Sequence, residues 1–144
     1  MTILRAFPIL GLLLAVGCSD VLGPDNPRVD FRTDREAYTL GQEGVLSLTN
    51  RHIGRLTHGR SLCPMLLERR AEGGWEEVLP PGEQVCVAVV MYLNPGETYT
   101  VSFLVLESLY EPGGEYRFGA FLGDESRATG VVKYTNAFTI QGEG

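Results

Sequence analysis

Short runs in which apolar and polar residues alternate constrain the fold of this chain more than any other feature of its sequence. The clearest run covers residues 98–105, where Tyr99, Val101, Phe103 and Val105 alternate with threonine and serine. Successive side chains of a β-strand point to opposite faces of its sheet, so this period of two predicts a strand with one buried face. Helical periodicity is sustained nowhere in the sequence, and we therefore expect an all-β fold.

The same alternation recurs along the body of the chain, with Gly, Pro and Asn between the runs. Further strands are predicted at 46–50, 63–70, 75–79, 116–122 and 132–140, the last of them bent near Asn136. The pair Gly73-Gly74 is predicted to close a hairpin between two of these strands. About seven short strands at such spacing are typical of a single β sandwich.

The run from Val85 to Tyr92 is apolar almost throughout and does not alternate. A strand of this kind is usually covered on both faces, so a core strand is the favoured interpretation. The alternative is an edge strand that pairs with a partner. Trp75 has two interpretations as well, because a lone tryptophan in a sandwich is more often part of the core than a platform for a ligand.

The N-terminus has the layout of an export signal. Arg5 precedes an apolar stretch from Ala6 to Val16, which is shorter than the about 20 residues that a membrane-spanning helix needs. Residues 14–18, Leu-Ala-Val-Gly-Cys, resemble the lipobox of bacterial lipoproteins. The resemblance implies that residues 1–17 are removed as a signal peptide and that Cys18 receives a lipid. The alternative is an ordinary secretory signal that leaves Cys18 as a thiol.

The resemblance also divides the chain. Residues 18–27 would form the lipidated cysteine and a flexible tether of turn-forming residues, and residues 28–144 would form the domain. The membrane is then a partner through the lipid on Cys18, because acyl chains hold a soluble domain at a bilayer without any protein span. The expected location is the periplasmic face of an outer membrane or the cell surface.

The domain contains two further cysteines, Cys63 and Cys86. In an exported protein a disulfide between them is the favoured prediction. A metal site that combines Cys63 with His52 and His58 is the weaker alternative, because the sequence has neither a CxxC nor an HxxxH pair. No metal and no cofactor is therefore expected.

The charge of the chain excludes one class of partner. The formal net charge is -6 and Lys133 is the only lysine, so nucleic acid is not an expected partner. The one basic cluster is interpreted as a solvated loop, with an anion-binding spot as the alternative; it consists of Arg51, His52, Arg55, His58 and Arg60. The residues considered for ligand contact are accordingly Arg55, Arg60 and Trp75.

A series of short motifs between residues 28 and 141 resembles bacterial immunoglobulin-like domains of exported and lipid-anchored proteins. More distantly, it resembles the β sandwich of the intracellular proteinase inhibitors of bacilli. The motifs are Tyr38-x-x-Gly41, Leu46-x-Leu48-x-Asn50, Leu67-Glu68-Arg69, Gly74-Trp75, Leu93-x-Pro95-Gly96, Gly114-x-Tyr116-Arg117 and Asn136-x-Phe138-Thr139. The resemblance implies a fold and leaves the function open, because folds of this class host unrelated functions.

No motif of a known catalytic class is present in the sequence. A G-x-S-x-G elbow, a phosphate-binding glycine loop and an H-E-x-x-H pair are all missing. We expect a lipid-anchored, non-enzymatic domain that serves as an interaction or structural module of the cell envelope, with an envelope protein or glycan as its partner. The alternative function is inhibition of extracytoplasmic proteases, and an enzyme ranks third.

Overall fold

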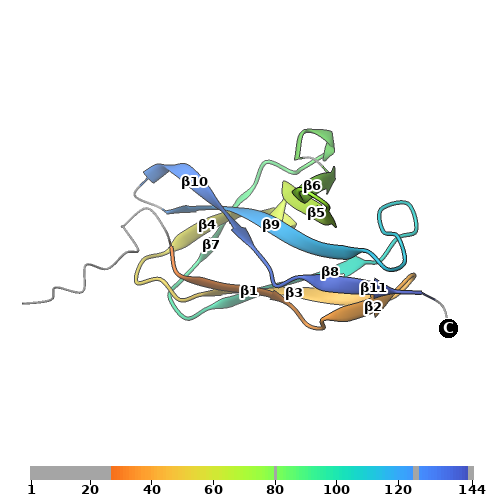
Figure 1. Cartoon of the computed structure of the whole chain (residues 1–144). Helices are drawn as coiled ribbons and strands as arrows, with labels where there is room; N and C mark the ends of the chain where they lie inside the picture. Colours follow the sequence, from red (N-terminus) through yellow and green to blue (C-terminus); the bar gives the residue numbers. More distant parts are fainter. Residues whose placement is uncertain (1–26, 80, 125–126, 143–144) are drawn as a thin grey trace, which may run out of the picture.

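The computed structural model describes residues 27–79, 81–124 and 127–142 (Figure 1). The predicted signal peptide, Cys18 and nearly all of the predicted tether lie outside these residues. Within the described ranges, no helix has the length and apolar character that a bilayer span requires.

The described chain is built from strands joined by turns and two short 3-10 segments. The strands are β1 (Val29–Thr33), β2 (Ala37–Thr39), β3 (Glu43–Asn50), β4 (Leu56–Gly59), β5 (Met65–Ala71), β6 (Gly74–Leu79), β7 (Val90–Leu93), β8 (Thr98–Leu104), β9 (Glu115–Asp124), β10 (Arg127–Tyr134) and β11 (Phe138–Gln141). The 3-10 segments are η1 (Arg60–Leu62) and η2 (Pro81–Glu83). The predicted bend near Asn136 is confirmed as the break between β10 and β11, and the predicted hairpin at Gly73-Gly74 joins β5 to β6.

The prediction of about seven strands was too low, since the described residues contain eleven. The missed strands are β1, β2 and β4, and the predicted last strand is divided into β10 and β11. Each missed strand has at most five residues, which is too short for alternation to distinguish it from a loop.

The strands form two sheets that pack face to face. The smaller sheet has the order β1-β3-β8, and the larger has the order β2-β11-β9-β4-β7, with β5 and β10 also paired to β9 and β6 paired to β5. In Figure 1 the layer with β1 and β3 lies below the layer with β9 and β10. Because β1 belongs to one sheet and β2 to the other, the first strands of the domain connect both layers, and β2 pairs in parallel with β11.

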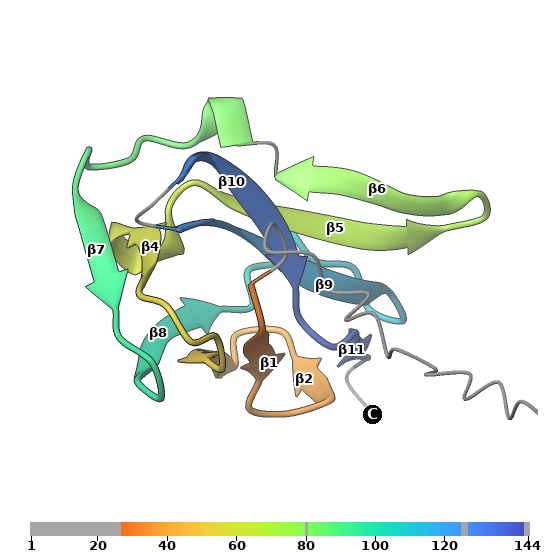
Figure 2. The same cartoon turned by 90° about the vertical axis from the view of Figure 1, so that its left-hand side faces the viewer.

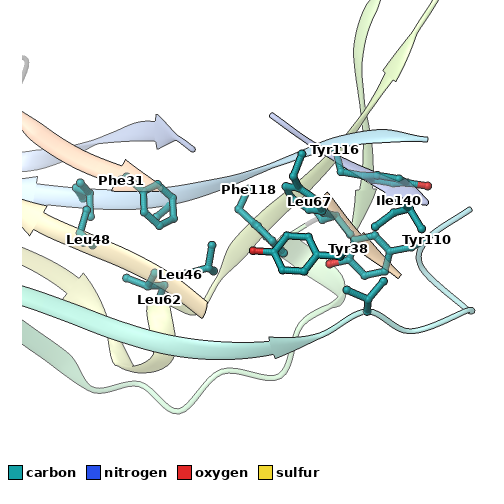
Figure 3. Packing of buried hydrophobic residues seen from close by; sticks show 14 of the residues in the cluster. Phe31, Tyr38, Leu46, Leu48, Leu62, Leu67, Tyr110, Tyr116, Phe118 and Ile140 are labelled. Carbon is teal, nitrogen blue, oxygen red and sulfur yellow. The ribbon is translucent and has the colours of Figure 1, made fainter. Parts of the chain in front are cut away.

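An aromatic cluster fills one half of the space between the sheets (Figure 3). Its members are Tyr38, Phe103, Tyr110, Tyr116, Phe118 and Phe138. The Phe138 ring stacks on Phe118 with 5.4 Å between centroids, and Phe103 meets Phe118 edge-on at 4.7 Å. Leu46 and Leu48, from the predicted strand at 46–50, are both fully buried, and Leu48 lies near Phe31 in the other half of the core (Figure 3).

Hydrogen bonds tie the polar ends of the aromatic cluster to the backbone. The Tyr38 hydroxyl donates to Asp34 Oδ1 at 2.7 Å, and the same carboxylate oxygen accepts the Val45 N–H at 2.7 Å. Burial and the bond to Asp34 raise the pKa of Tyr38 to about 12, so the hydroxyl remains a donor. Among the described residues, no buried polar side-chain atom lacks a hydrogen-bond partner.

Tyr116 forms a tyrosine corner. It lies near the start of β9, is completely buried, and its hydroxyl accepts a hydrogen bond of 2.7 Å from the backbone N–H of Glu111. Such a corner, at the loop that leads into the central strand of one sheet, is a hallmark of immunoglobulin-like sandwiches. Together with the two facing sheets, it confirms the predicted all-β, immunoglobulin-like β sandwich.

The predicted core strand from Val85 to Tyr92 was wrong. Only residues 90–93 form a strand, β7, and the segment before it runs outside the sheets. The valines of this run and Tyr92 are exposed, with Val87 and Val90 at 64% and 62% accessible, while Met91 is half-buried. The physical reason is position, because β7 is the outermost strand of its sheet and pairs only with β4.

Candidate functional site

The strongest candidate for a functional site is the exposed apolar run itself, here called the valine-rich edge and defined as residues 85–92. Its exposed large side chains are Val85, Val87, Val89, Val90 and Tyr92. Figure 2 shows β7 at the margin of the molecule, away from β1, β2 and β11. Exposed apolar side chains are common singly, but a contiguous group of this kind marks an interaction surface.

The register with β4 shows which backbone groups of β7 are open. His58 pairs with Met91 and Leu56 with Leu93, and the Arg60 N–H donates to the Val89 carbonyl at 3.2 Å. In an antiparallel ladder, alternate residues direct their N–H and C=O groups to the same neighbour. Met91 therefore bonds toward β4, while the backbone groups of Val90 and Tyr92 point away from the sheet.

A disulfide fixes the segment that leads into β7. Cys86 is bonded to Cys63, whose Cα lies 5.6 Å away, so the predicted pairing is confirmed. Beside the bond, the surface is hollowed by about 200 Å³; the lining residues are Arg60, Ser61, Cys63, Val85, Cys86 and Val87. The cross-link holds these exposed valines against η1, where no sheet pairing would hold them.

Two of the three residues predicted for ligand contact lie at the valine-rich edge. The Arg55 guanidinium carbon sits 4.4 Å from the centroid of the Tyr92 ring, in a cation–π contact. Arg60 is exposed in η1 and lines the hollow beside the disulfide. Within the described residues Arg60 takes part in no ion pair.

The remaining residues of the predicted basic cluster do not form one solvated loop. His58 is buried in β4, where its ring lies 4.5 Å from Tyr99 and Nδ1 lies 2.8 Å from the Gly59 carbonyl oxygen. Burial lowers the pKa of His58 below its ordinary value. Arg51 is exposed and lies 3.9 Å from the Asp30 carboxylate.

The weaker alternative of a metal site at Cys63, His52 and His58 is wrong, because the Cys63 sulfur belongs to the disulfide. In the part of the chain that the structure describes, no group of three His, Cys, Asp or Glu side chains is arranged to hold a metal ion.

Trp75, the third predicted contact residue, lies far along the sheet on β6 and is not in the core, so its favoured interpretation was wrong. Its ring is half-buried and packs against Arg117, whose guanidinium carbon is 4.3 Å from the Trp75 centroid and 3.9 Å from that of Tyr134. Arg117 also forms a 2.6 Å ion pair with the buried carboxylate of Glu68. The Arg70 guanidinium carbon also lies 5.3 Å from the Trp75 centroid, and these contacts give the group a structural role.

Sequence reasoning missed the ion pair between Glu68 and Arg117 because the two residues lie 49 positions apart. The strand pairing brings them together, since Glu68 on β5 stands directly opposite Arg117 on β9. The only signal in the sequence was an acidic and a basic residue within the alternating runs, which is a weak signal.

The acidic pair Glu76 and Glu77 lies on the exposed β6, beside a hollow of about 240 Å³ that Glu107 and Glu111 also line. Arg69 neutralises part of this charge through a 2.8 Å ion pair with Glu111.

No family model and no curated protein sequence matches this chain. Among solved structures, the sporulation control protein Spo0M from Bacillus subtilis is 14% identical with a TM-score of 0.46, over 81% of this chain and 49% of its own. This chain thus spans about half the length of that protein.

Two further solved structures are similar. PapD-like domain 7 (ASH/PapD-like) of human CEP192 is 15% identical with a TM-score of 0.41, over 99% of both chains. A β-glucosidase, EmGH1, from Erythrobacter marinus is 18% identical with a TM-score of 0.34, over 79% of this chain and 15% of its own. These similarities concern overall shape and indicate no activity for this chain.

Proposed function

We propose that this chain is a lipid-anchored, non-enzymatic binding module of the cell envelope, which holds a protein partner at the valine-rich edge. The observation that carries the proposal is the exposure of an uncharged apolar run that leads into β7, the outermost strand of its sheet. Burying such surface against a partner contributes about 25 cal/mol for each Å² of apolar area removed from water.

The chemistry of the edge supports binding over catalysis. The only thiols of the domain that were considered as nucleophiles or ligands are consumed in the disulfide between Cys63 and Cys86. Apolar side chains beside open backbone groups supply the two components with which a sheet edge recognises another chain. Arg60 adds a cation at the border of this surface.

The anchor part of the proposal is supported by the lipobox-like residues 14–18 and by the short distance from Cys18 to the domain. Residues 18–27 span at most about 35 Å when fully extended, since an extended chain covers about 3.3–3.6 Å per residue. A lipid on Cys18 would therefore keep the domain within one protein diameter of the bilayer, on the periplasmic face of an outer membrane or on the cell surface.

The anchor is tested by intact mass spectrometry of the full chain purified from its native membrane. The expected mass corresponds to residues 18–144 with acyl chains attached, and it falls to the unmodified value in a Cys18→Ser variant. A native protein without acyl chains would contradict the lipid anchor and would leave the edge open to separate testing.

The binding part is tested by cross-linking in intact cells, followed by purification of the tagged chain. The double variant V87E/V90E places charges on the valine-rich edge, while T98E/T100E places the same charges on the exposed face of β8. We expect cross-linked products with the wild type and the β8 control, and their loss with the edge variant. Equal products from all proteins would refute the role of the edge.

A further inference from the structure

We propose that the partner at the valine-rich edge is a second copy of this chain, with β7 of one copy antiparallel to β7 of the other and Met91 on the two-fold axis. This inference rests on the proposed function, because it names the occupant of the same surface. It joins the two larger sheets into one continuous sheet across the interface.

The open backbone groups permit this pairing. The N–H and C=O groups of Val90 and Tyr92 point away from β4, as the register shows. Hydrogen-bonded pairs in an antiparallel ladder form between residues that both face the neighbouring strand. Val90 of one copy can therefore pair with Tyr92 of the second copy, and Tyr92 with Val90 of the second copy, so all four residues are satisfied.

The register is self-complementary because the open residues are two positions apart. A two-fold axis through Met91 places each Val90 opposite a Tyr92 and each Met91 opposite itself. A shift by one residue would set open groups against the groups already bonded to β4, so the ladder would be lost. The alternation of open and bonded residues thus favours this symmetric register over registers shifted by one residue.

The side chains are complementary in the same register. Val90 and Tyr92 lie on one face of β7 and are both exposed. Pairing places a β-branched side chain directly across from an aromatic ring, a combination that contributes about 0.2–1 kcal/mol per pair relative to alanine. Residues 85–92 contain no charged residue, and the Arg55 guanidinium beside them lies against the Tyr92 ring of its own copy.

The other sheet edges in the described ranges carry features that discourage strand addition. β1 contains Asp30 and Arg32, β6 contains Glu76 and Glu77, and β10 contains Lys133. β8 is uncharged but presents threonine and serine, and β2 has only three residues. Charged and very short edges are the usual protection against edge-to-edge pairing. β7 and β8 both lack charges, but β7 presents exposed valine and tyrosine side chains where β8 presents mainly threonine and serine, which is expected for an edge that another copy covers.

The test uses symmetric disulfide cross-linking of the full chain in its native membrane. Residues opposite each other at a non-hydrogen-bonded antiparallel site have Cα atoms about 4.5 Å apart, within the range that a disulfide bridges. Under mild oxidation we expect Met91→Cys to shift from the monomer to the dimer mass. Val87→Cys and Thr100→Cys are the controls, because both positions are more exposed but neither faces its own counterpart.

A second variant controls for accidental thiol contact. Adding Tyr92→Lys to Met91→Cys places one lysine beside each thiol and opposite Val90, so dimer formation should be lost, while Lys at Thr100 should leave it unchanged. Folding is checked in each variant by the mass of the intact Cys63–Cys86 bond. Equal cross-linking at positions 87, 91 and 100 would overturn the two-fold pairing.

The outcome separates this inference from the proposed function. If Met91→Cys yields no dimer while V87E/V90E still abolishes cross-linked products in cells, the edge binds a different protein, and the self-pairing is refuted. If the chain is unlipidated but Met91→Cys dimerises when Cys18 is replaced by serine, the anchor fails and the self-pairing stands.

Discussion

The aromatic cluster and the valine-rich edge are both apolar segments of the same sandwich, yet they are held in opposite ways. In the cluster, Tyr116 and Phe138 are buried on all sides, and strand pairing and hydrogen bonds fix every neighbour. At the edge, Val85 and Val87 face water and are held by a disulfide in place of a sheet. Apolar sequence is therefore buried in the core at one place and exposed at the other, and the neighbouring strands decide which.

Truncation of a large side chain is the strongest way to separate the two regions. Phe138→Ala should lower the free energy of unfolding by about 4 kcal/mol, because the substitution leaves a cavity among Tyr38, Phe118 and Tyr116. The matched edge variant, Val87→Ala, should change it by less than about 0.5 kcal/mol. Urea unfolding measures both, and similar losses would mean that the edge is buried in solution.

Removal of the disulfide tests what holds the edge. Replacing Cys63 and Cys86 by serine should cost about 3 kcal/mol in the chain-entropy model. Hydrogen exchange should accelerate most in residues 85–90, which open locally without the bond, while the amides of β9 exchange through global unfolding and should accelerate only by the lost global stability. Uniform acceleration across the sandwich would contradict a local role for the bond.

The fold could be predicted from alternation because each sheet of a sandwich has one buried and one open face. That signal identified β3, β5, β6, β8, β9 and the bent final strand. It failed at residues 85–92, because a continuous apolar run has the same composition whether a second layer covers it or not. The order of strands in space places β7 at the edge, and no local pattern encodes that order.

The candidate site was predicted only in part for the same reason. The local cluster of basic residues identified Arg55 and Arg60. The presence of two cysteines, Cys63 and Cys86, in a domain expected to be exported predicted the disulfide between them. The contact of Arg55 with Tyr92 depends on the pairing of β4 with β7, which joins residues far apart in the sequence. Trp75 was assigned to the core on its residue type, but its partner Arg117 comes from another strand.

The tyrosine corner offers a smaller test within the aromatic region. Tyr116→Phe keeps the ring and removes the hydroxyl that accepts the Glu111 N–H, so the free energy of unfolding should fall by about 1 kcal/mol. Tyr92→Phe, at the exposed edge, is the matched control and should be near neutral. Thermal denaturation compares the melting temperatures of the two variants. An equal decrease in both would show that the corner has no special role in stability.

The smallest expected effect is a pH dependence of folding stability that arises from His58, next to the valine-rich edge. His58 is buried next to β7, and burial lowers its pKa below the ordinary 6.5. Stability from the neutral ring is complete above pH 6.5 and declines as the pH falls further, because the unfolded chain then binds a proton that the folded chain resists.

The measurement compares melting temperatures between pH 8 and pH 5 for the wild type and His58→Gln. The decline below pH 6.5 should be steeper in the wild type, whereas His52→Gln should retain the wild-type slope. Parallel curves for the wild type and His58→Gln would show that the buried imidazole does not couple protons to folding.

The pairing of β1 determines how the domain responds to mechanical tension. β1 starts at Val29, directly after the first described residues, and lies antiparallel to β3 along five residue pairs from Val29 with Asn50 to Thr33 with Leu46. A pull applied through the N-terminus runs along this strand, so its cross-strand bonds are sheared together and cannot be opened one at a time. β2, which follows, is hydrogen-bonded in parallel to β11 of the opposite sheet, so the same pull also loads that pairing. A load applied through the first residues would therefore act on these pairings in shear.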